Sequence, residues 1–159
     1  AQVRRRALES AGYISGDAEI VAEIERMDAL DDDERVSALR AMGRQCDPRW
    51  RERISRELSN ADPELRFEAA RAAGASGDQA YLPALIDLID DEDGEVRLAA
   101  IASLGAIGGT MAVRVLRRLV GAGDPAVADA AQDALDEALT TSEESFRQPL
   151  FDLRHRSEA

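Results

Sequence analysis

The sequence predicts an all-α fold, a right-handed α-solenoid of about four and a half helix pairs, and two observations indicate it. The first is a repeat. DPELRFEAARAAGASG (62–77) returns 31 residues later as DGEVRLAAIASLGAIG (93–108) and again as DPAVADAAQDALDEAL (124–139). The second is composition, because a chain with only 4% aromatic residues and much alanine suits closely packed helices better than a β-sandwich.

Four residue types keep register at this interval: Asp31, Asp62, Asp93 and Asp124; Arg4, Arg35, Arg66 and Arg97; Ala7, Ala38, Ala69, Ala100 and Ala131; and Gly12, Gly43, Gly74 and Gly105. Alanine lets stacked helices approach closely, since its methyl group fills the gap without pushing the layers apart. The glycines leave two interpretations open, a helix C′ position or a point of close backbone contact.

Each repeat is expected to form two helices, and the third repeat illustrates the argument. Asp62 can cap the first helix and Pro63 suits its first position, while Asp78 can cap the second helix. That second helix carries a core-facing stripe: Leu82, Leu85, Ile86 and Ile89. Helix breaks are expected near 12–17, 29–33, 43–47, 60–62, 74–78, 90–93 and 108–110.

The solenoid is expected to span 1–139, with repeats at about 1–30, 31–61, 62–92 and 93–123 and a half repeat at 124–139. A C-terminal tail, 140–159, follows, and its first residues TTSEES predict a hinge or a new helix cap. The tail has apolar residues that would cover the open end of the last repeat, or dock on a partner or in a homodimer: Phe146, Leu150, Phe151 and Leu153.

The pattern D-x-E-V-R-x-x-A-A-x-x-L-G-x-I-G of residues 93–108 resembles the short HEAT-like repeat named after phycobilisome lyase subunits. The resemblance extends over about 1–139 and implies stacked helix pairs. For function it implies several classes, because the family includes bilin lyase subunits, adaptor proteins and DNA-repair relatives. Glu34 departs from the pattern, since the other repeats have valine or leucine at that position.

The chain is strongly acidic, with a net charge of −12, and all of its 20 basic residues are arginine. This combination resembles the proteins of halophilic archaea, whose acidic surfaces keep them hydrated in salt. A genome that favours arginine codons is the alternative.

The longest uncharged run, 98–113, is too short to span a membrane and no leader is evident, so a cytoplasmic location is expected.

The sequence predicts no enzymatic activity, cofactor or metal site. The single histidine, His155, and the single cysteine, Cys46, are far apart in the chain. The acidic run 90–93 lacks the spacing of a calcium loop and is interpreted as a solvated turn. We therefore expect a non-enzymatic adaptor or scaffold that presents its concave face to a protein partner.

The second helices are expected to line that concave face. Their varied polar positions predict the partner-binding residues, which are Arg26, Arg53, Arg56, Asp87, Arg114 and Arg118. Arginine is enriched at binding hot spots and pairs well with carboxylates, so the expected partner presents an acidic or C-terminal carboxylate segment. An ordinary salt-bridged surface is the alternative. The aligned Arg35, Arg66 and Arg97 are instead expected to pair with acids of the next repeat.

Two other functions remain open, a bilin-lyase-like enzyme subunit and a HEAT-like nucleic-acid binder. A net charge of −12 disfavours nucleic acid, because phosphate contacts need a basic surface.

We predict that the protein becomes more stable from dilute buffer to molar salt. The negative charges repel one another, and screening them favours the compact state. The melting temperature measured against sodium chloride concentration checks this, and a flat or falling curve would contradict the interpretation of salt adaptation.

Overall fold

The computed structural model describes the backbone of residues 18–29 and 31–154 and, apart from Asp32, their side chains as far as Thr140. All regular structure in this part of the chain is helical, as the sequence predicts. The first helix expected for the first repeat lies outside the described residues.

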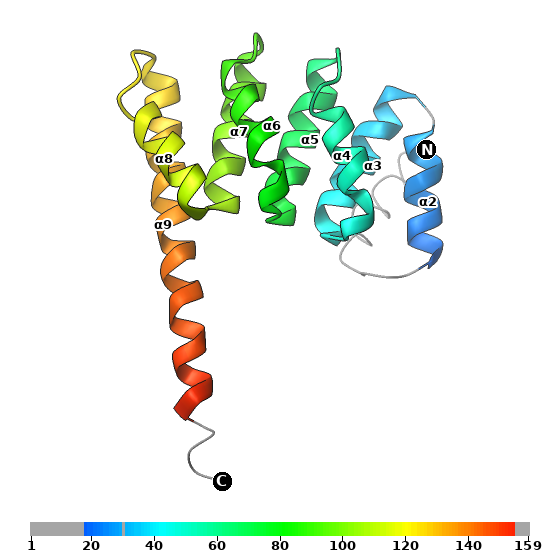
Figure 1. Cartoon of the computed structure of the whole chain (residues 1–159). Coiled ribbons are helices and arrows are strands. Elements are labelled where there is room, and N and C mark those ends of the chain that lie inside the picture. The colour runs from blue at the N-terminus through cyan, green and yellow to red at the C-terminus, as the bar shows by residue number, and fades with distance from the viewer. Residues whose placement is uncertain (1–17, 30, 155–159) are drawn as a thin grey trace.

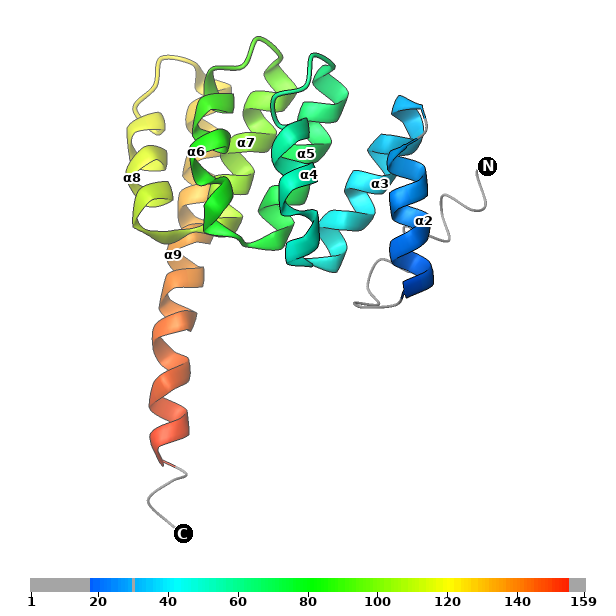
Figure 2. The ribbon, with the colours of Figure 1, turned by 45° about the vertical axis from the view of Figure 1, so that its right-hand side comes forward.

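Helix α2 (Ala18–Asp28) precedes three helix pairs (Figure 1). The first helices of the pairs are α3 (Asp32–Gln45), α5 (Pro63–Ser76) and α7 (Gly94–Ile107). The second helices are α4 (Arg51–Glu57), α6 (Leu82–Asp87) and α8 (Gly109–Leu119), with short 3-10 turns η1 (Pro48–Trp50), η2 (Gln79–Tyr81) and η3 (Leu88–Asp90) around α4 and α6. Helix α9 (Pro125–Arg154) stacks on the last pair. Figure 2 shows the second helices as one layer in front of the first helices and α9.

The aspartates in register cap the helices that follow them. In each case the side chain accepts a hydrogen bond from a backbone N–H of the first turn, at 3.1 Å for Asp31, 2.9 Å for Asp62, 2.8 Å for Asp93 and 2.9 Å for Asp124. Asp78 caps the η2 turn in the same way, at 2.9 Å. These contacts satisfy donors that a helix N-terminus leaves free, and they confirm the predicted caps at Asp62 and Asp78.

The aligned glycines are points of close contact between first helices. A Cβ added to Gly43 would lie 2.7 Å from the Cα of Ala72, and one added to Gly105 would lie 2.7 Å from the backbone oxygen of Ala134. The same construction at Gly74 meets the Oγ of Ser103 at 2.6 Å. The helix C-caps with positive φ fall three residues later, at Cys46, Gly77 and Gly108.

The aligned alanines lie in the core between these helices. Ala38, Ala69, Ala100 and Ala131 are all completely buried. Trp50 is also buried, and its indole N–H donates to the side-chain oxygen of Gln45 at 2.7 Å. The first helices and α9 make most of the contacts between neighbouring pairs, whereas the second helices touch one another little. The concave shape expected for the second layer stays a prediction.

The hinge or new helix cap expected at TTSEES is wrong, because α9 passes through this segment without a break. The segment contains neither glycine nor proline, and the hydroxyl of Thr140 donates to the carbonyl of Asp136 at 2.9 Å within the helix. In both views the last turns of α9 project beyond the solenoid and do not fold back across the last pair (Figures 1 and 2). The side chains of Phe146, Leu150, Phe151 and Leu153 lie outside the described residues, so docking by the tail stays a prediction.

We predict that Gly105→Ala destabilises the protein by roughly 1–3 kcal/mol, because the new methyl group would meet the backbone of Ala134 and push α9 away from α7. Gly123→Ala is the matched control, since a Cβ there meets nothing within 4 Å. Urea unfolding of both variants checks the prediction. An unchanged midpoint for Gly105→Ala would mean that this contact does not set the helix spacing.

Candidate functional site

Two of the aligned arginines pair with acids of their own repeat. Arg66 and Asp91 form a nearly buried pair, with side-chain exposures of 9% and 7%, in which Nε and Nη2 each lie 2.8 Å from a carboxylate oxygen. The Nη1 of Arg66 also donates to the carbonyls of Asn60 and Ala61 at 2.9 Å. The expected pairing with the next repeat is therefore wrong, because the guanidinium turns back to the loop before its own helix.

Arg97 repeats the loop contact of Arg66, and Arg35 is the second aligned arginine that pairs with an acid of its own repeat. Arg97 donates from Nη1 to the carbonyl of Asp91 at 2.8 Å, one repeat after the equivalent contact of Arg66. Arg35 donates to the Oε2 of Glu57 at 2.8 Å. Burial alone would raise the pKa of Glu57, but hydrogen bonds from Arg35 and Asn60 outweigh it and hold that pKa below its usual range. Arg35 connects its helix to the second helix of its repeat, whereas Arg66 and Arg97 also bind the loop that precedes their own helix, and these are structural roles.

Other arginines link one repeat to the next. Arg40 on α3 pairs with Glu68 on α5 at 2.6 Å, and Arg51 on α4 pairs with Asp78 at 2.5 Å. The backbone N–H of Ala80 and the guanidinium of Arg51 both bind Asp78 and lower the pKa of its carboxyl group, although burial opposes them. These ion pairs join neighbouring repeats, but they do not involve the aligned arginines for which such pairs were expected.

Three of the predicted partner-binding arginines already form ion pairs with acids of the same molecule. Arg26 pairs with Glu23 on its own helix, and this contact raises the pKa of Arg26. Arg53 lies 2.5 Å from the carboxylate of Asp28 and 6.0 Å from the centre of the Trp50 ring. Arg56 is exposed and lies within 4.0 Å of Asp28 and 3.4 Å of Glu57. The structure therefore brings Arg53 and Arg56 together around one acid of the preceding repeat.

The remaining predicted residues lie on the surface of α6 and α8. Helix α8 buries Ala112, Val115 and Leu116 and exposes a face that we call the α8 face, made of Met111, Arg114, Arg117 and Arg118. The side chains of Arg114, Arg117 and Arg118 form no hydrogen bond or ion pair with another residue in the part of the chain that the structure describes. Met111 beside them is 50% exposed. Asp87 is exposed at the end of α6.

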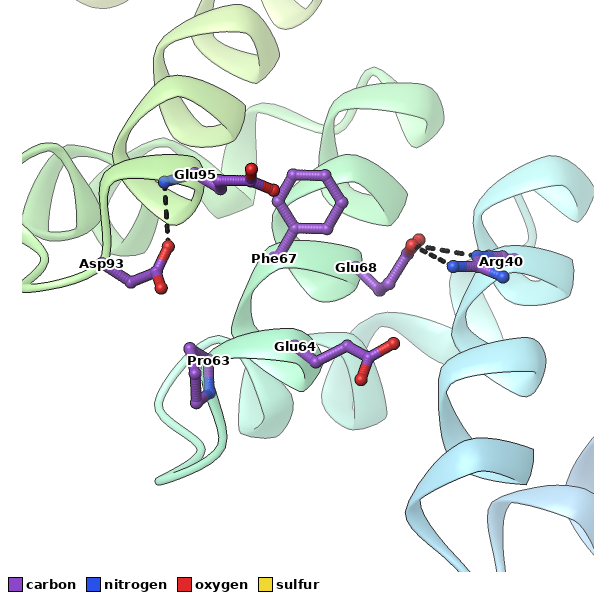
Figure 3. A pocket seen from close by; sticks show the side chains of 7 residues that line it. All are labelled: Arg40, Pro63, Glu64, Phe67, Glu68, Asp93 and Glu95. Carbon is purple, nitrogen blue, oxygen red and sulfur yellow. Dashed lines mark hydrogen bonds and ion pairs between the residues drawn. The ribbon is translucent and has the colours of Figure 1, made fainter.

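The first helices carry two hollows that the sequence analysis missed. The hollow that we call the Phe67 hollow has a volume of about 350 Å³ and is lined by Arg40, Pro63, Glu64, Phe67, Glu68, Asp93 and Glu95 (Figure 3). The Arg44 hollow, of about 320 Å³, is lined by Arg40, Gly43, Arg44, Glu68, Arg71, Ala72 and Ala75. The signal that could have found them is Phe67, which lies outside the core-facing stripe of its helix.

The two hollows share the pair of Arg40 and Glu68 but differ in charge. Carboxylates surround the half-buried ring of Phe67 in the first hollow, whereas arginines dominate the second. Arg71 connects them, because its guanidinium lies 5.7 Å from the centre of the Phe67 ring and 3.7 Å from Glu68. A ligand lying across both would therefore meet opposite charges at its two ends.

Among the described residues no three histidine, cysteine, aspartate or glutamate side chains are grouped so that they could hold a metal ion. Likewise, none of the described helices has the length and apolar character needed to cross a bilayer.

A family model described as HEAT repeats matches residues 20–104 and, overlapping it, residues 82–158. No curated protein matches the chain.

We predict that Asp91→Asn lowers the free energy of unfolding by roughly 3 kcal/mol at neutral pH, because it leaves the nearly buried Arg66 without its counter-charge. The hydrogen bond from Arg66 holds the pKa of Asp91 below its usual range, although burial opposes it. This contribution is therefore present above the unfolded pKa of about 3.9 and is lost as the pH falls through the lower, folded pKa.

Urea unfolding at neutral and acidic pH checks this. The difference between Asp91→Asn and the wild type should shrink as the pH falls below about 4. The exposed Asp90 is the matched control, and Asp90→Asn should change stability by less than about 0.5 kcal/mol. A deficit of Asp91→Asn that does not depend on pH would contradict the assignment to the ion pair.

Proposed function

Because the chain belongs to the HEAT-repeat family, we propose that it is a non-enzymatic protein-interaction module, an adaptor or scaffold that presents a helical surface to a protein partner. We further propose that its repeats are of the phycobilisome-lyase type and that it works in the cytoplasm of a halophilic archaeon. The repeat pattern, the acidity and the absence of lysine support these finer assignments.

The observation that carries the proposal is the α8 face. Most other described arginines bind an acid or a carbonyl within the molecule, whereas Arg114, Arg117 and Arg118 have no partner in the described part. The half-exposed Met111 adds an apolar contact next to them. Arginine and methionine are enriched at protein interfaces, and a guanidinium can bind a carboxylate through two parallel hydrogen bonds.

The chemistry of this face suits a partner that presents acidic side chains or a C-terminal carboxylate. In a salty solution long-range attraction is screened, so only close contacts of this kind contribute to binding. Arg26, Arg53 and Arg56 bind acids of the chain itself, and using them would require breaking those pairs. We therefore place the contact mainly on α8, with Asp87 on the neighbouring α6 as an acceptor for a basic residue.

The alternatives have separate tests. Absorbance after incubation with tetrapyrroles tests a bilin-lyase-like enzyme subunit. A salt-dependent mobility shift tests a nucleic-acid binder, which the net charge of −12 disfavours.

We predict that changing Arg114, Arg117 and Arg118 together to glutamine abolishes capture of the partner, or weakens it at least about tenfold, because these side chains would supply its charge-assisted hydrogen bonds. Affinity capture from a native lysate in high salt, followed by mass spectrometry, compares the variant with the wild type. Circular dichroism checks that helical content is unchanged.

A control variant separates the α8 face from overall charge. Ser59→Glu, Ala102→Glu and Ala126→Glu together change three exposed positions away from α8. They lower the net charge by three, from −12 to −15, as the glutamine variant does. The control should capture the same partner as the wild type. If the glutamine variant does so with wild-type affinity, the functional surface lies elsewhere, and residues 146–153 are the next candidate.

A further inference from the structure

The Arg44 hollow concentrates positive charge in an acidic chain. Arg40, Arg44 and Arg71 line it together with a single acid, Glu68, so positive charges exceed negative ones by two. Glu68 is buried, and its Oε1 already accepts two hydrogen bonds from Arg40, at 2.9 and 2.6 Å. Glu68 is therefore shared between Arg40 and Arg71, whose Nη1 lies 3.7 Å from the same oxygen, and Arg44 is left without a counter-charge in the hollow.

Two nitrogens on one edge of the Arg44 guanidinium lack a hydrogen-bond acceptor. Its Nε and Nη2 are buried and have no hydrogen-bond partner. The same edge of Arg66 holds the carboxylate of Asp91, and the same edge of Arg40 holds Glu68. Two parallel donors in this fork match the two oxygens of a carboxylate, and a buried donor without an acceptor is unfavourable. Arg44 therefore has the geometry of a carboxylate-binding arginine without a carboxylate.

Stacking of the repeats does not require these arginines. At the 31-residue interval, Arg44 corresponds to Ala75, Ala106 and Glu137, and Arg40 and Arg71 correspond to Ala102 and Asp133. The equivalent contacts of α5 with α7 and of α7 with α9 form without them. The charge of the Arg44 hollow is thus a property of one interface, whereas the core positions around it are shared by all repeats.

The hollow has room for a ligand because its other walls are small. Gly43, Ala72 and Ala75 line it, and Gly43 lies against the backbone of Ala72. Arg44 is one of the residues that line the hollow, so a rotation of its side chain would bring the buried Nε and Nη2 to an acceptor there. The adjoining Phe67 hollow shares Arg40 and Glu68 and extends the surface beyond the size of one carboxylate.

We propose that the Arg44 hollow binds the side-chain carboxylate of a glutamate or aspartate in a peptide segment of a protein partner, with Arg44 and Arg71 as the residues that hold it. The rest of the segment lies over the Phe67 hollow, where an apolar side chain meets the Phe67 ring and a basic side chain meets the surrounding carboxylates. This site belongs to the first helices and is separate from the α8 face. A test of it therefore does not depend on the outcome for the proposed function.

Nuclear magnetic resonance of the arginine Nε–Hε groups tests the site directly. The full chain is titrated with the blocked peptide acetyl-Glu-Leu-Lys-amide (the glutamate peptide), with acetyl-Gln-Leu-Lys-amide (the glutamine peptide) and with sodium acetate, all in about 1 M sodium chloride, where screening acts within about 3 Å. The Arg44 resonance, assigned by its loss in Arg44→Gln, should shift saturably with the glutamate peptide. The apparent affinity for acetate should be at least about tenfold weaker, and the glutamine peptide should cause no shift.

Variants locate the binding. Arg44→Gln should weaken the glutamate peptide at least about tenfold, as followed by the Arg71 resonance, whereas Arg117→Gln on the α8 face should leave the Arg44 shift unchanged. Absence of a saturable Arg44 shift in the wild type would overturn the site. Equal affinity for acetate and the glutamate peptide would overturn the assignment to a peptide segment.

Discussion

The close approach of the first helices is the constraint on which the rest of the structure depends. Glycine on one helix lies against alanine or serine on the next at three successive interfaces, and in each case a single added methyl group would collide with the neighbour. Such short spacing lets completely buried alanines fill the core between helices. Because every interface repeats the same contact, the aspartate caps and the loops before the first helices also come into register.

Arginine in this chain serves two purposes, and packing separates them. Arg66 lies close to a neighbouring acid and to loop carbonyls, so it becomes part of the framework. Arg114 lies on the exposed side of α8, and its side chain has no hydrogen-bond or ion-pair partner among the described residues. In the part of the chain that the structure describes, few arginine side chains are thus left for contact with other molecules, and the proposed function rests on these positions.

The two layers offer different kinds of binding surface. The α8 face is a set of long exposed side chains next to an exposed methionine, which suits the rim of an extended protein contact. The Arg44 hollow is recessed between helices and has small residues as its walls. A recessed arginine can select one carboxylate, whereas exposed arginines contribute to affinity over a broad area.

The sequence by itself determined the repeat, the helix pairs, their breaks and the aspartate caps, because each of these depends on local backbone preference and on which face of a helix is apolar. Only the tertiary structure decided between the two roles of Gly43, Gly74 and Gly105, since a close contact involves a partner 29 residues away. It also decided which acid each arginine binds and placed Arg44 in a hollow. A long side chain reaches several positions, and the distance and angle between packed helices, which periodicity does not encode, select among them.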